Sequence, residues 1–196
     1  MLQYNLHFPT IISKHHDKEF ANKVLPIAQN ILNNNSHKNL SYESTYDQVE
    51  SITKLKNYRW IDEKIISLAN QYCKDNKYNT FPWGFDTNLF VSRMKKGDNH
   101  KLHDHPTSCL SGVVYLNTGG EKAQITFETE QIRQWTGFTP IEECLQNRKQ
   151  ITYEVEVGDI LMWESWVLHY VPYFENIIRE TLVFNVFPRV NYNVEG

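Results

Sequence analysis

Apolar residues recur at two different spacings along this chain. Between Asp17 and Asn34 they return every three or four residues, which predicts a helix that buries one face. Pro26 lies inside this pattern, so we expect a kink or a late start of that helix. A second stripe predicts a helix over about residues 62–74, and it consists of Ile61, Ile65, Leu68, Ala69 and Tyr72. Both stripes are typical of helices that pack against a core.

After Asn76 the pattern changes to short runs that alternate or are continuously apolar, as β-strands are. Strands are predicted at residues 88–94, 110–116, 123–128, 152–157, 160–163, 169–171 and 179–187. Residues 117–120, Asn-Thr-Gly-Gly, predict a hairpin turn between two of them. Residues 129–150 form a long connection, which predicts either disorder or a substrate lid containing Trp135 and Phe138.

Helices first and strands afterwards predict an α+β fold, with N-terminal helices packed outside a β-sandwich or jelly roll. Residues 37–56 are polar and irregular, and no element is predicted there. No internal repeat and no clear linker interrupts the 196 residues, so we expect a single domain over residues 1–196. Within it, residues 1–80 form mainly helical support and residues 81–196 form the β-core.

Composition narrows the function classes. The net charge is −3 and the basic residues are scattered, which argues against nucleic acid or an anionic membrane as partner. The apolar runs are too short to span a membrane, and the N-terminus lacks the apolar region of a signal peptide. Cys73, Cys109 and Cys144 include no C-x-x-C pair, so we expect reduced, buried thiols in a cytoplasmic protein.

Histidines cluster directly before the predicted strand at residues 110–116. His100, His103 and His105 fall within six residues. On an extended segment His103 and His105 point to the same face, because strand side chains alternate. Together with a third ligand from a distant strand, two such imidazoles can bind a divalent metal on one face and leave coordination positions open. The alternative is a pair of solvated surface histidines.

Two residues far along the chain complete this candidate site. The neighbours of His169 in the sequence are apolar or aromatic, which predicts that this histidine is at least partly buried. They are Trp163, Trp166, Val167, Leu168 and Val171. The alternative for His169 is a core histidine satisfied by one backbone carbonyl. The last strand divides by parity: after Glu180 one face is apolar, with Leu182, Phe184 and Val186, and should pack on the helices. Arg179, Thr181 and Asn185 share the other face, where burying them without partners would cost several kcal/mol. An anionic ligand removes this cost, because a guanidinium binds a carboxylate through two hydrogen bonds. The alternative for Arg179 is an internal salt bridge.

Three motifs together resemble a known family. They are H-x-H-P-x-S-x-x-S-G-V-x-Y-L from His103 to Leu116, then GDILMWESWVLHYVP, then RETLVFNVF, and the start HFPTIIS is also similar. The chain thus resembles the 2-oxoglutarate- and Fe(II)-dependent oxygenases of bacteria and phages, relatives of the prolyl hydroxylases. This resemblance implies a double-stranded β-helix (jelly-roll, cupin-like) core.

The resemblance also implies roles for individual residues. His103 corresponds to the first iron ligand and His169 to the distal one. Arg179, ten residues after His169, corresponds to the arginine that pairs with the far carboxylate of 2-oxoglutarate, with Thr181 and Tyr115 beside that carboxylate.

The middle ligand departs from the wider superfamily, which has H-x-D or H-x-E where this chain has His105. The options are a three-histidine site, a two-histidine site completed by water, or a bulge that turns Asp104 inward. His100 is a poorer candidate, because a position three residues before His103 does not share its face on a regular strand.

The function implied by the resemblance is an Fe(II)- and 2-oxoglutarate-dependent dioxygenase, a hydroxylase of an unactivated C–H bond. The expected substrate is a small molecule, peptide or protein, with a prolyl or other amino-acid residue as a candidate, and a homodimer is one option for the assembly. The alternative is a non-catalytic, cupin-like metal- or ligand-binding protein, which His105 favours and the polar face of the last strand disfavours. A zinc hydrolase is a third option, but no carboxylate stands at a convincing spacing to act as general base.

Overall fold

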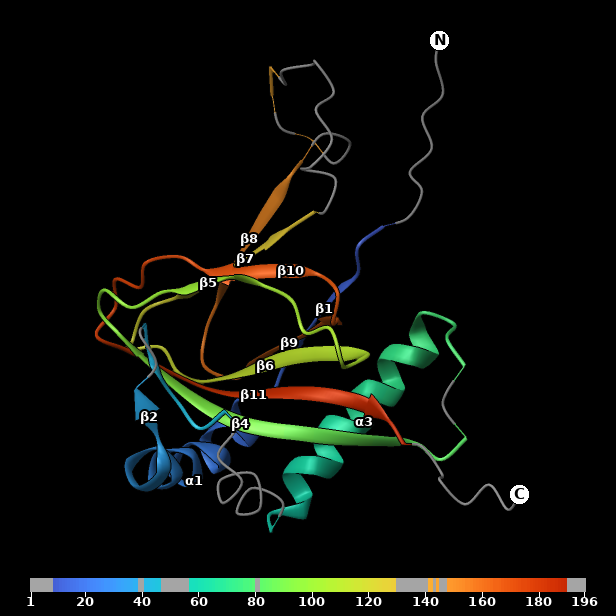
Figure 1. Ribbon diagram of the computed structural model, residues 1–196, viewed down its shortest axis with the longest axis horizontal. Helices are drawn as coiled ribbons and strands as arrows, with labels where there is room; N and C mark the ends of the chain where they lie inside the picture. Colours follow the sequence, from blue (N-terminus) through green and yellow to red (C-terminus); the bar gives the residue numbers. More distant parts are fainter. Residues whose placement is uncertain are drawn as a thin grey trace.

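Two antiparallel β-sheets and two helices make up the part of the chain that the computed structural model describes, which is residues 9–38, 41–46, 57–79, 82–129, 141–142, 144 and 148–189 (Figure 1). The helices are α1 (Lys18–Asn35) and α3 (Arg59–Asp75). The larger sheet has the order β1-β9-β6-β11-β4-β3-β2 and the smaller sheet the order β5-β10-β7-β8.

The strands of the larger sheet are β1 (Ile12–His16), β2 (His37–Lys38), β3 (Glu43–Ser44), β4 (Phe85–Lys95), β6 (Leu110–Asn117), β9 (Asp159–Glu164) and β11 (Ile178–Pro188). Those of the smaller sheet are β5 (His100–His103), β7 (Ala123–Glu128), β8 (Gln150–Val155) and β10 (Leu168–Val171). All seven predicted strands are confirmed, with shifts of at most three residues at their ends. The strand β5, which includes His100 and His103, was not predicted, because its four residues contain only one apolar side chain, Leu102, and so carry no apolar period.

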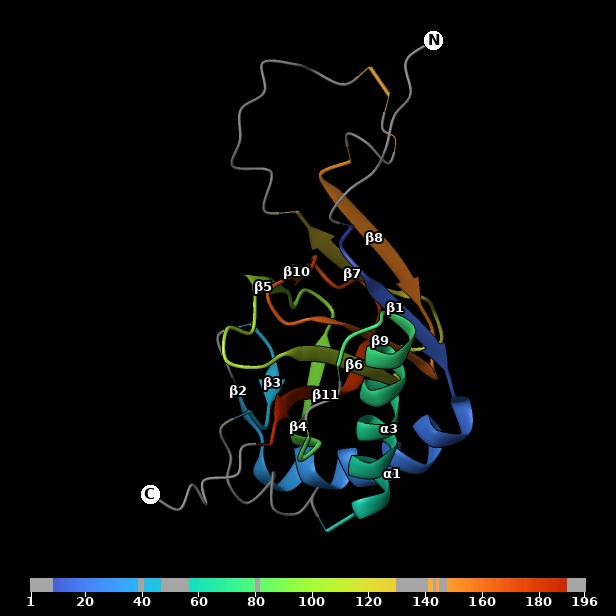
Figure 2. The same cartoon turned by 90° about the vertical axis from the view of Figure 1, so that its right-hand side faces the viewer.

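Both predicted helices are confirmed, and their apolar stripes cover the outer face of the larger sheet. Figure 2 shows α1 and α3 on the side of that sheet that faces away from the smaller one. Helix α1 starts at Lys18, capped by the Asp17 carboxylate, which accepts the Phe20 N–H at 2.9 Å. The helix runs through Pro26, so the late start considered for it is wrong. Helix α3 begins three residues earlier than predicted.

Strand β11 separates two cores, because its side chains alternate between the two faces of the larger sheet. Leu182, Phe184 and Val186 point to the helices, where they join the buried stripes of α1 and α3. On the opposite face Val183 packs against a second apolar cluster between the sheets, which includes Val113, Ile125, Phe127, Trp163 and Val171. The predicted division of this strand by parity is therefore confirmed.

Gly112, in the middle of β6, lies very close to both neighbouring strands, β9 and β11. A Cβ at this position would clash with the Phe184 ring and with the Leu161 carbonyl oxygen. Glycine is therefore required here for space, so that β6 can lie flat against both neighbours.

Other predictions can be compared with the same residues. Cys73 is buried and Cys109 is partly buried, but the expectation that all three thiols are buried is wrong, since Cys144 is exposed in the segment between β7 and β8. Most of the lid predicted at residues 129–150, with Trp135 and Phe138, lies outside the described residues. Among the helices described, none has the length and apolar character needed to cross a membrane.

Candidate metal centre

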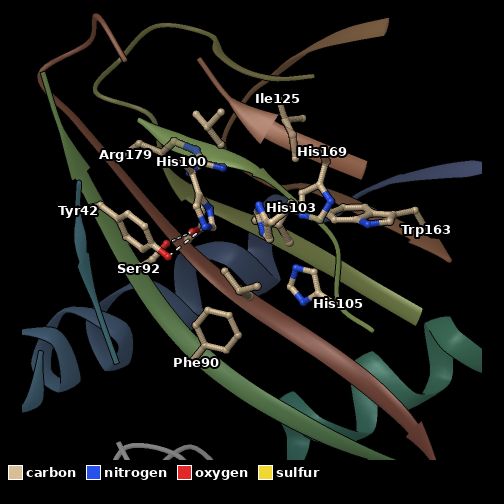
Figure 3. Close-up of a pocket in the computed structure, with 14 residues that line it drawn as sticks. Tyr42, Phe90, Ser92, His100, His103, His105, Ile125, Trp163, His169 and Arg179 are labelled. Carbon is tan, nitrogen blue, oxygen red and sulfur yellow. Dashed lines mark hydrogen bonds between the residues drawn. The ribbon is translucent and has the colours of Figure 1, made fainter. Parts of the chain in front are cut away.

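A cavity lies between the two sheets and is lined by both. The larger sheet contributes Phe90, Ser92, Val113, Trp163, Arg179, Thr181 and Val183, and the smaller sheet contributes His100, His103, Ile125, His169 and Val171. Tyr42 and His105 complete the lining from the segments that precede β3 and follow β5. Figure 3 shows the rings of His103, His105 and His169 toward one end of this cavity and Arg179 toward the other, with His100 between them.

Three of the predicted site residues come together in this cavity. His103, near the end of β5, is the cross-strand partner of His169 on β10, and His105 follows two residues after His103. The nearest ligand nitrogens of the three rings all lie within 4.8 Å of one another. Their ring centroids are 4.2 Å apart for His103 and His169, and 5.1 Å apart for each pair that includes His105. This arrangement presents three imidazoles from one side, as a facial metal site requires.

Backbone carbonyls fix the tautomer of two of these rings. His103 Nδ1 lies 2.8 Å from the Lys101 carbonyl oxygen, and His169 Nδ1 lies 2.9 Å from the Val167 carbonyl oxygen. A carbonyl can only accept, so Nδ1 carries the proton in both rings and Nε2 keeps a free lone pair. Metal-bound histidines are oriented by this kind of bond. A bond from His169 to one backbone carbonyl was the alternative to a metal-binding role. The same bond also leaves Nε2 of His169 available as a ligand atom.

Burial keeps these rings in the form that binds metals. It lowers the pKa of His103, lowers that of His169 well below its usual value, and, with the neighbouring His103, lowers the pKa of His105 to about 4. The neutral imidazole therefore predominates at neutral pH, and only neutral imidazole offers a lone pair to a cation.

Asp104 stands apart from this cluster, because its side chain is exposed and is not one of the groups that converge. A second group of potential ligands, His16, Glu156 and Asp159, lies elsewhere on the molecule. There the Lys14 ammonium lies 2.8 Å from Asp159 Oδ2 and already balances its charge. The histidine cluster is therefore the better candidate for a cation.

Arg179 reaches the cavity from β11 and is 5% exposed. Its Nη1 and Nη2 lie 3.1 Å from Met94 Sδ and 3.5 Å from the Tyr115 hydroxyl, and its guanidinium carbon lies 5.1 Å from the centre of the Tyr115 ring. Its Nε is buried without any hydrogen-bond partner. Among the described residues no carboxylate pairs with Arg179, so the internal salt bridge considered for it is not found there. A buried guanidinium with an unused donor, facing a cavity, suits an anionic ligand.

Thr181 and Tyr115, predicted beside Arg179, take different positions. Thr181 lines the cavity, and its Oγ1 lies 2.8 Å from Ser92 Oγ on β4. Tyr115 is fully buried behind the cavity wall, with its ring and hydroxyl against Arg179. Thr181 can thus contact a ligand directly, whereas Tyr115 supports the guanidinium.

His100 and Tyr42 were missed as site residues. The Tyr42 hydroxyl lies 3.2 Å from His100 Nε2, and the His100 ring lies 4.0 Å from the His103 ring, between the other histidines and Arg179 (Figure 3). His103 of β5 pairs with His169 of β10, and His100 pairs with Val171. The two paired positions are three residues apart on β5 but only two apart on β10. This bulge puts positions three apart on the same face, whereas the argument from a regular strand made His100 only a poorer candidate. His100 is not one of the three converging ligand groups.

Comparison with known proteins gives a family match over the same region. The model of the family described as "Putative 2OG-Fe(II) oxygenase" matches residues 88–185. No curated protein matches the chain in sequence.

Several solved structures share the fold at low sequence identity. A Pseudomonas putida prolyl-4-hydroxylase has 13% identity and a TM-score of 0.57, over 92% of this chain and 94% of that one. HygX from Streptomyces hygroscopicus, solved with nickel and 2-oxoglutarate bound, has 9% identity and a TM-score of 0.62, over 95% and 90%. The viral collagen prolyl hydroxylase of Paramecium Bursaria Chlorella virus-1 has 12% identity and a TM-score of 0.53, over 91% and 96%.

Proposed function

Because the chain belongs to the family of 2-oxoglutarate- and Fe(II)-dependent oxygenases, we propose that His103, His105 and His169 hold its Fe(II) and that Arg179 binds the far carboxylate of its 2-oxoglutarate. The proposed reaction is hydroxylation of a C–H bond in a peptide, protein or small molecule, with a prolyl or other amino-acid residue as the first candidate. Two prolyl hydroxylases among the structures with the same fold support that candidate.

The residues present fit both groups. Imidazole nitrogen is a ligand that iron accepts, and three such donors on one side leave coordination positions free on the other. Arg179 supplies the second half of the fit, since its buried Nε has no partner and an incoming carboxylate would provide one. The position of this guanidinium in the same cavity as the three converging histidines is the single observation that carries the proposal.

When bound, Fe(II) and 2-oxoglutarate would supply the oxidising chemistry, with dioxygen as the oxidant. One oxygen atom would enter the substrate C–H bond, and the other would enter the succinate that forms from 2-oxoglutarate with loss of carbon dioxide. The protein's own residues bind, orient and exclude water. Arg179 and Thr181 hold the carboxylate at the far end of the cavity, and Tyr115 keeps the guanidinium in place through its ring and hydroxyl. The walls between these groups are apolar, and they consist of Phe90, Val113, Ile125, Trp163, Val171 and Val183. Such walls limit the access of bulk water to the reacting groups.

The two facing sheets support the further proposal that the core is a double-stranded β-helix, or jelly roll, within one domain of 196 residues. The proposed location is cytoplasmic, as the sequence suggests through three cysteines without a C-x-x-C pair.

The test is an anaerobic titration followed in the visible spectrum. Fe(II) and 2-oxoglutarate are added singly and together to the wild type, to Arg179→Ala and to Arg189→Ala, a matched control whose arginine pairs with Asp86 at the surface. We expect a weak charge-transfer band that requires both additions, persists in Arg189→Ala and fades in Arg179→Ala. If metal binds and no band forms, the alternative of a non-catalytic, cupin-like protein, which His105 favours, becomes the better account.

A further inference from the structure

Of the three histidines in the proposed metal centre, His105 lies in a turn rather than on a strand. It begins the His105 turn (residues 105–108), which the Ser108 N–H closes by donating to the His105 carbonyl oxygen at 3.3 Å. Pro106 occupies the second position of this turn, where its ring presets the backbone angle that such a turn needs. A residue before a proline is itself restricted to an extended backbone. The local sequence therefore limits the backbone of His105, but it does not tie this turn to the sheets.

Ser165 ties the His105 turn to a second turn, the β9–β10 turn (residues 164–167). All the polar groups of Ser165 bind the connection between β5 and β6. Its N–H donates to the Cys109 carbonyl oxygen at 3.1 Å, and its carbonyl oxygen accepts the His105 N–H at 2.9 Å. Its hydroxyl accepts that of Ser108 at 2.8 Å. Ser165 is 1% exposed, so these bonds form where bulk water does not compete for them.

The β9–β10 turn also orients His169. The Val167 N–H closes this turn on the Glu164 carbonyl oxygen at 3.0 Å, and the Val167 carbonyl oxygen accepts the Nδ1–H of His169 at 2.9 Å. One short segment thus holds two of the three candidate ligands, His105 through its backbone and His169 through its ring. The separation of these two ligands therefore depends on how firmly the two turns are joined.

A chain of hydroxyls adds side-chain bonds to the backbone bonds between the two turns. Ser165 Oγ lies 2.7 Å from Ser111 Oγ, and Ser111 Oγ donates to Asn185 Oδ1 at 2.9 Å. A hydroxyl has one proton, and that of Ser111 goes to Asn185, so Ser165 donates to Ser111. Ser165 can then accept the proton of Ser108, whose other hydroxyl contacts are longer, at 3.3 Å. The chain has one direction, and it anchors the His105 turn to β11.

We propose that Ser108 and Ser165 are positioning residues for His105. The bond between their hydroxyls joins the His105 turn to the turn that orients His169, and it thereby fixes the separation of these two ligands. The inference rests on the proposed function, since it assumes that His105 and His169 bind the metal. The alternative is a pair of serines that only satisfy each other's hydrogen-bonding groups. In that case their bond affects the stability of the fold but not its affinity for a metal.

The first measurement is the Ni(II) affinity of the full chain by calorimetry, because it needs neither turnover nor 2-oxoglutarate. We expect Ser108→Ala to weaken Ni(II) binding about 10-fold, at the lower end of the usual effect of changing the outer partners of a metal-bound histidine, because Ser108 acts through the backbone of His105. Ser108→Thr keeps the hydroxyl at a half-buried position and should restore the wild-type affinity. The matched control is Ser13→Ala, which removes a hydroxyl that donates to the Met162 carbonyl oxygen at 3.1 Å, outside both turns. This control should leave Ni(II) affinity unchanged.

Double-mutant cycles separate positioning from a general effect on the fold. Adding Ser165→Ala to Ser108→Ala should cause little further loss of Ni(II) affinity, because both changes break the same bond. In a His105→Ala background, Ser108→Ala should cause no further loss, because the ligand that it positions is gone. The inference is overturned if Ser108→Ala binds Ni(II) as the wild type does, or if its loss persists at the same factor without His105. Should Ser108→Ala fail to fold, Ser165→Ala takes its place in the cycle with His105→Ala.

The cycle with His105→Ala also distinguishes the two proposals. If His105→Ala binds Ni(II) as tightly as the wild type, His105 is not a ligand and the proposed metal site is wrong together with this inference. If His105→Ala loses affinity and Ser108→Ala does not, the metal site stands and only the role of the two serines is refuted.

Discussion

Arg179 and Glu180 are neighbours on β11 that point to opposite faces, and they should respond to mutation in opposite directions. Glu180 is 0% exposed and fully paired. Its carboxylate accepts hydrogen bonds from Arg93 Nε and Gln29 Nε2, each at 2.8 Å, and from Asn117 Nδ2 at 3.1 Å. Arg179 is buried with an unpartnered Nε and has no carboxylate partner among the described residues. The charge of Glu180 is balanced by residues of the fold, whereas that of Arg179 has no countercharge among the described residues.

We expect Arg179→Met to stabilise the ligand-free protein. Burying a charge costs several kcal/mol, and the contact with the Tyr115 ring returns about 2 kcal/mol of it. Methionine keeps much of the side-chain volume and removes the charge, which leaves a net gain of about 1–3 kcal/mol. For a chain of this length that corresponds to a rise in melting temperature of about 2–12 °C. Glu180→Gln should do the reverse and cost about 1–3 kcal/mol, because the partly buried Arg93 loses its charge-assisted hydrogen bond to this carboxylate and keeps only Glu43 as countercharge, at 3.3 Å.

The assay is thermal unfolding of the wild type and both variants, first with a chelator and then with Ni(II) and 2-oxoglutarate. Ligand at about 100 times its dissociation constant should add about 2.7 kcal/mol to the wild type and to Glu180→Gln, but nothing specific to 2-oxoglutarate in Arg179→Met. Two results refute the reasoning. One is a loss of stability in Arg179→Met comparable to that of Glu180→Gln, which would mean that the fold already satisfies this arginine. The other is an undiminished response of Arg179→Met to 2-oxoglutarate.

Three further predictions follow from single contacts. His100→Leu should weaken 2-oxoglutarate binding to the Ni(II) form about 10-fold, the value of one hydrogen bond in a buried site, and calorimetric titration measures it; equal affinity would remove His100 from the ligand's surroundings. Gly112→Ala should destabilise by about 1–3 kcal/mol in urea unfolding, because its methyl group meets the Phe184 ring and a backbone oxygen, and an unchanged midpoint would contradict that crowding. The hydrogen bond with Lys64, and next that with the Phe20 N–H, lowers the pKa of Asp17 below its ordinary 3.8. The charged carboxylate of Asp17 therefore stabilises the fold above pH 3.8, and this contribution is lost as the pH falls through the lowered pKa. Asp17→Asn should thus melt below the wild type at pH 7 and approach it below about pH 4, and a pH-independent difference in melting temperature would exclude this charge effect.

The residues predicted correctly share one property, which is that their placement depends on local periodicity. The alternation along β11 was sufficient to put Thr181 in the cavity and Phe184 under the helices. The apolar surroundings of His169 in sequence were sufficient to predict its burial. Each of these statements needs only the period of a strand and the chemistry of its neighbours.

What the sequence did not disclose depends on register between distant strands. His100 enters the cavity because β5 carries a bulge opposite β10, and nothing in the sequence from His100 to His103 marks that extra residue. Tyr42 reaches His100 from a segment without a readable pattern, 58 positions away. Asn185 was assigned to the correct face, but its partner Ser111 comes from β6, whose alignment with β11 is a property of the folded sheet.

The charges of the cavity explain why the metal and the anion should depend on each other. Among the described residues that line it, the histidines whose pKa values are lowered are neutral at pH 7, and Arg179 adds a positive charge. A site with an aspartate in place of His105 would carry a negative charge of its own to offset a divalent cation. In the proposed site, an anion that pairs with Arg179 would also offset the charge of the cation that the histidines would hold. Each ligand therefore raises the affinity for the other by the same factor, because coupling between two binding equilibria is reciprocal. A site with His105 in place of a carboxylate is therefore compatible with oxygenase chemistry. In such a site the negative charge that offsets the metal would come from 2-oxoglutarate, whereas an aspartate would supply it from the protein.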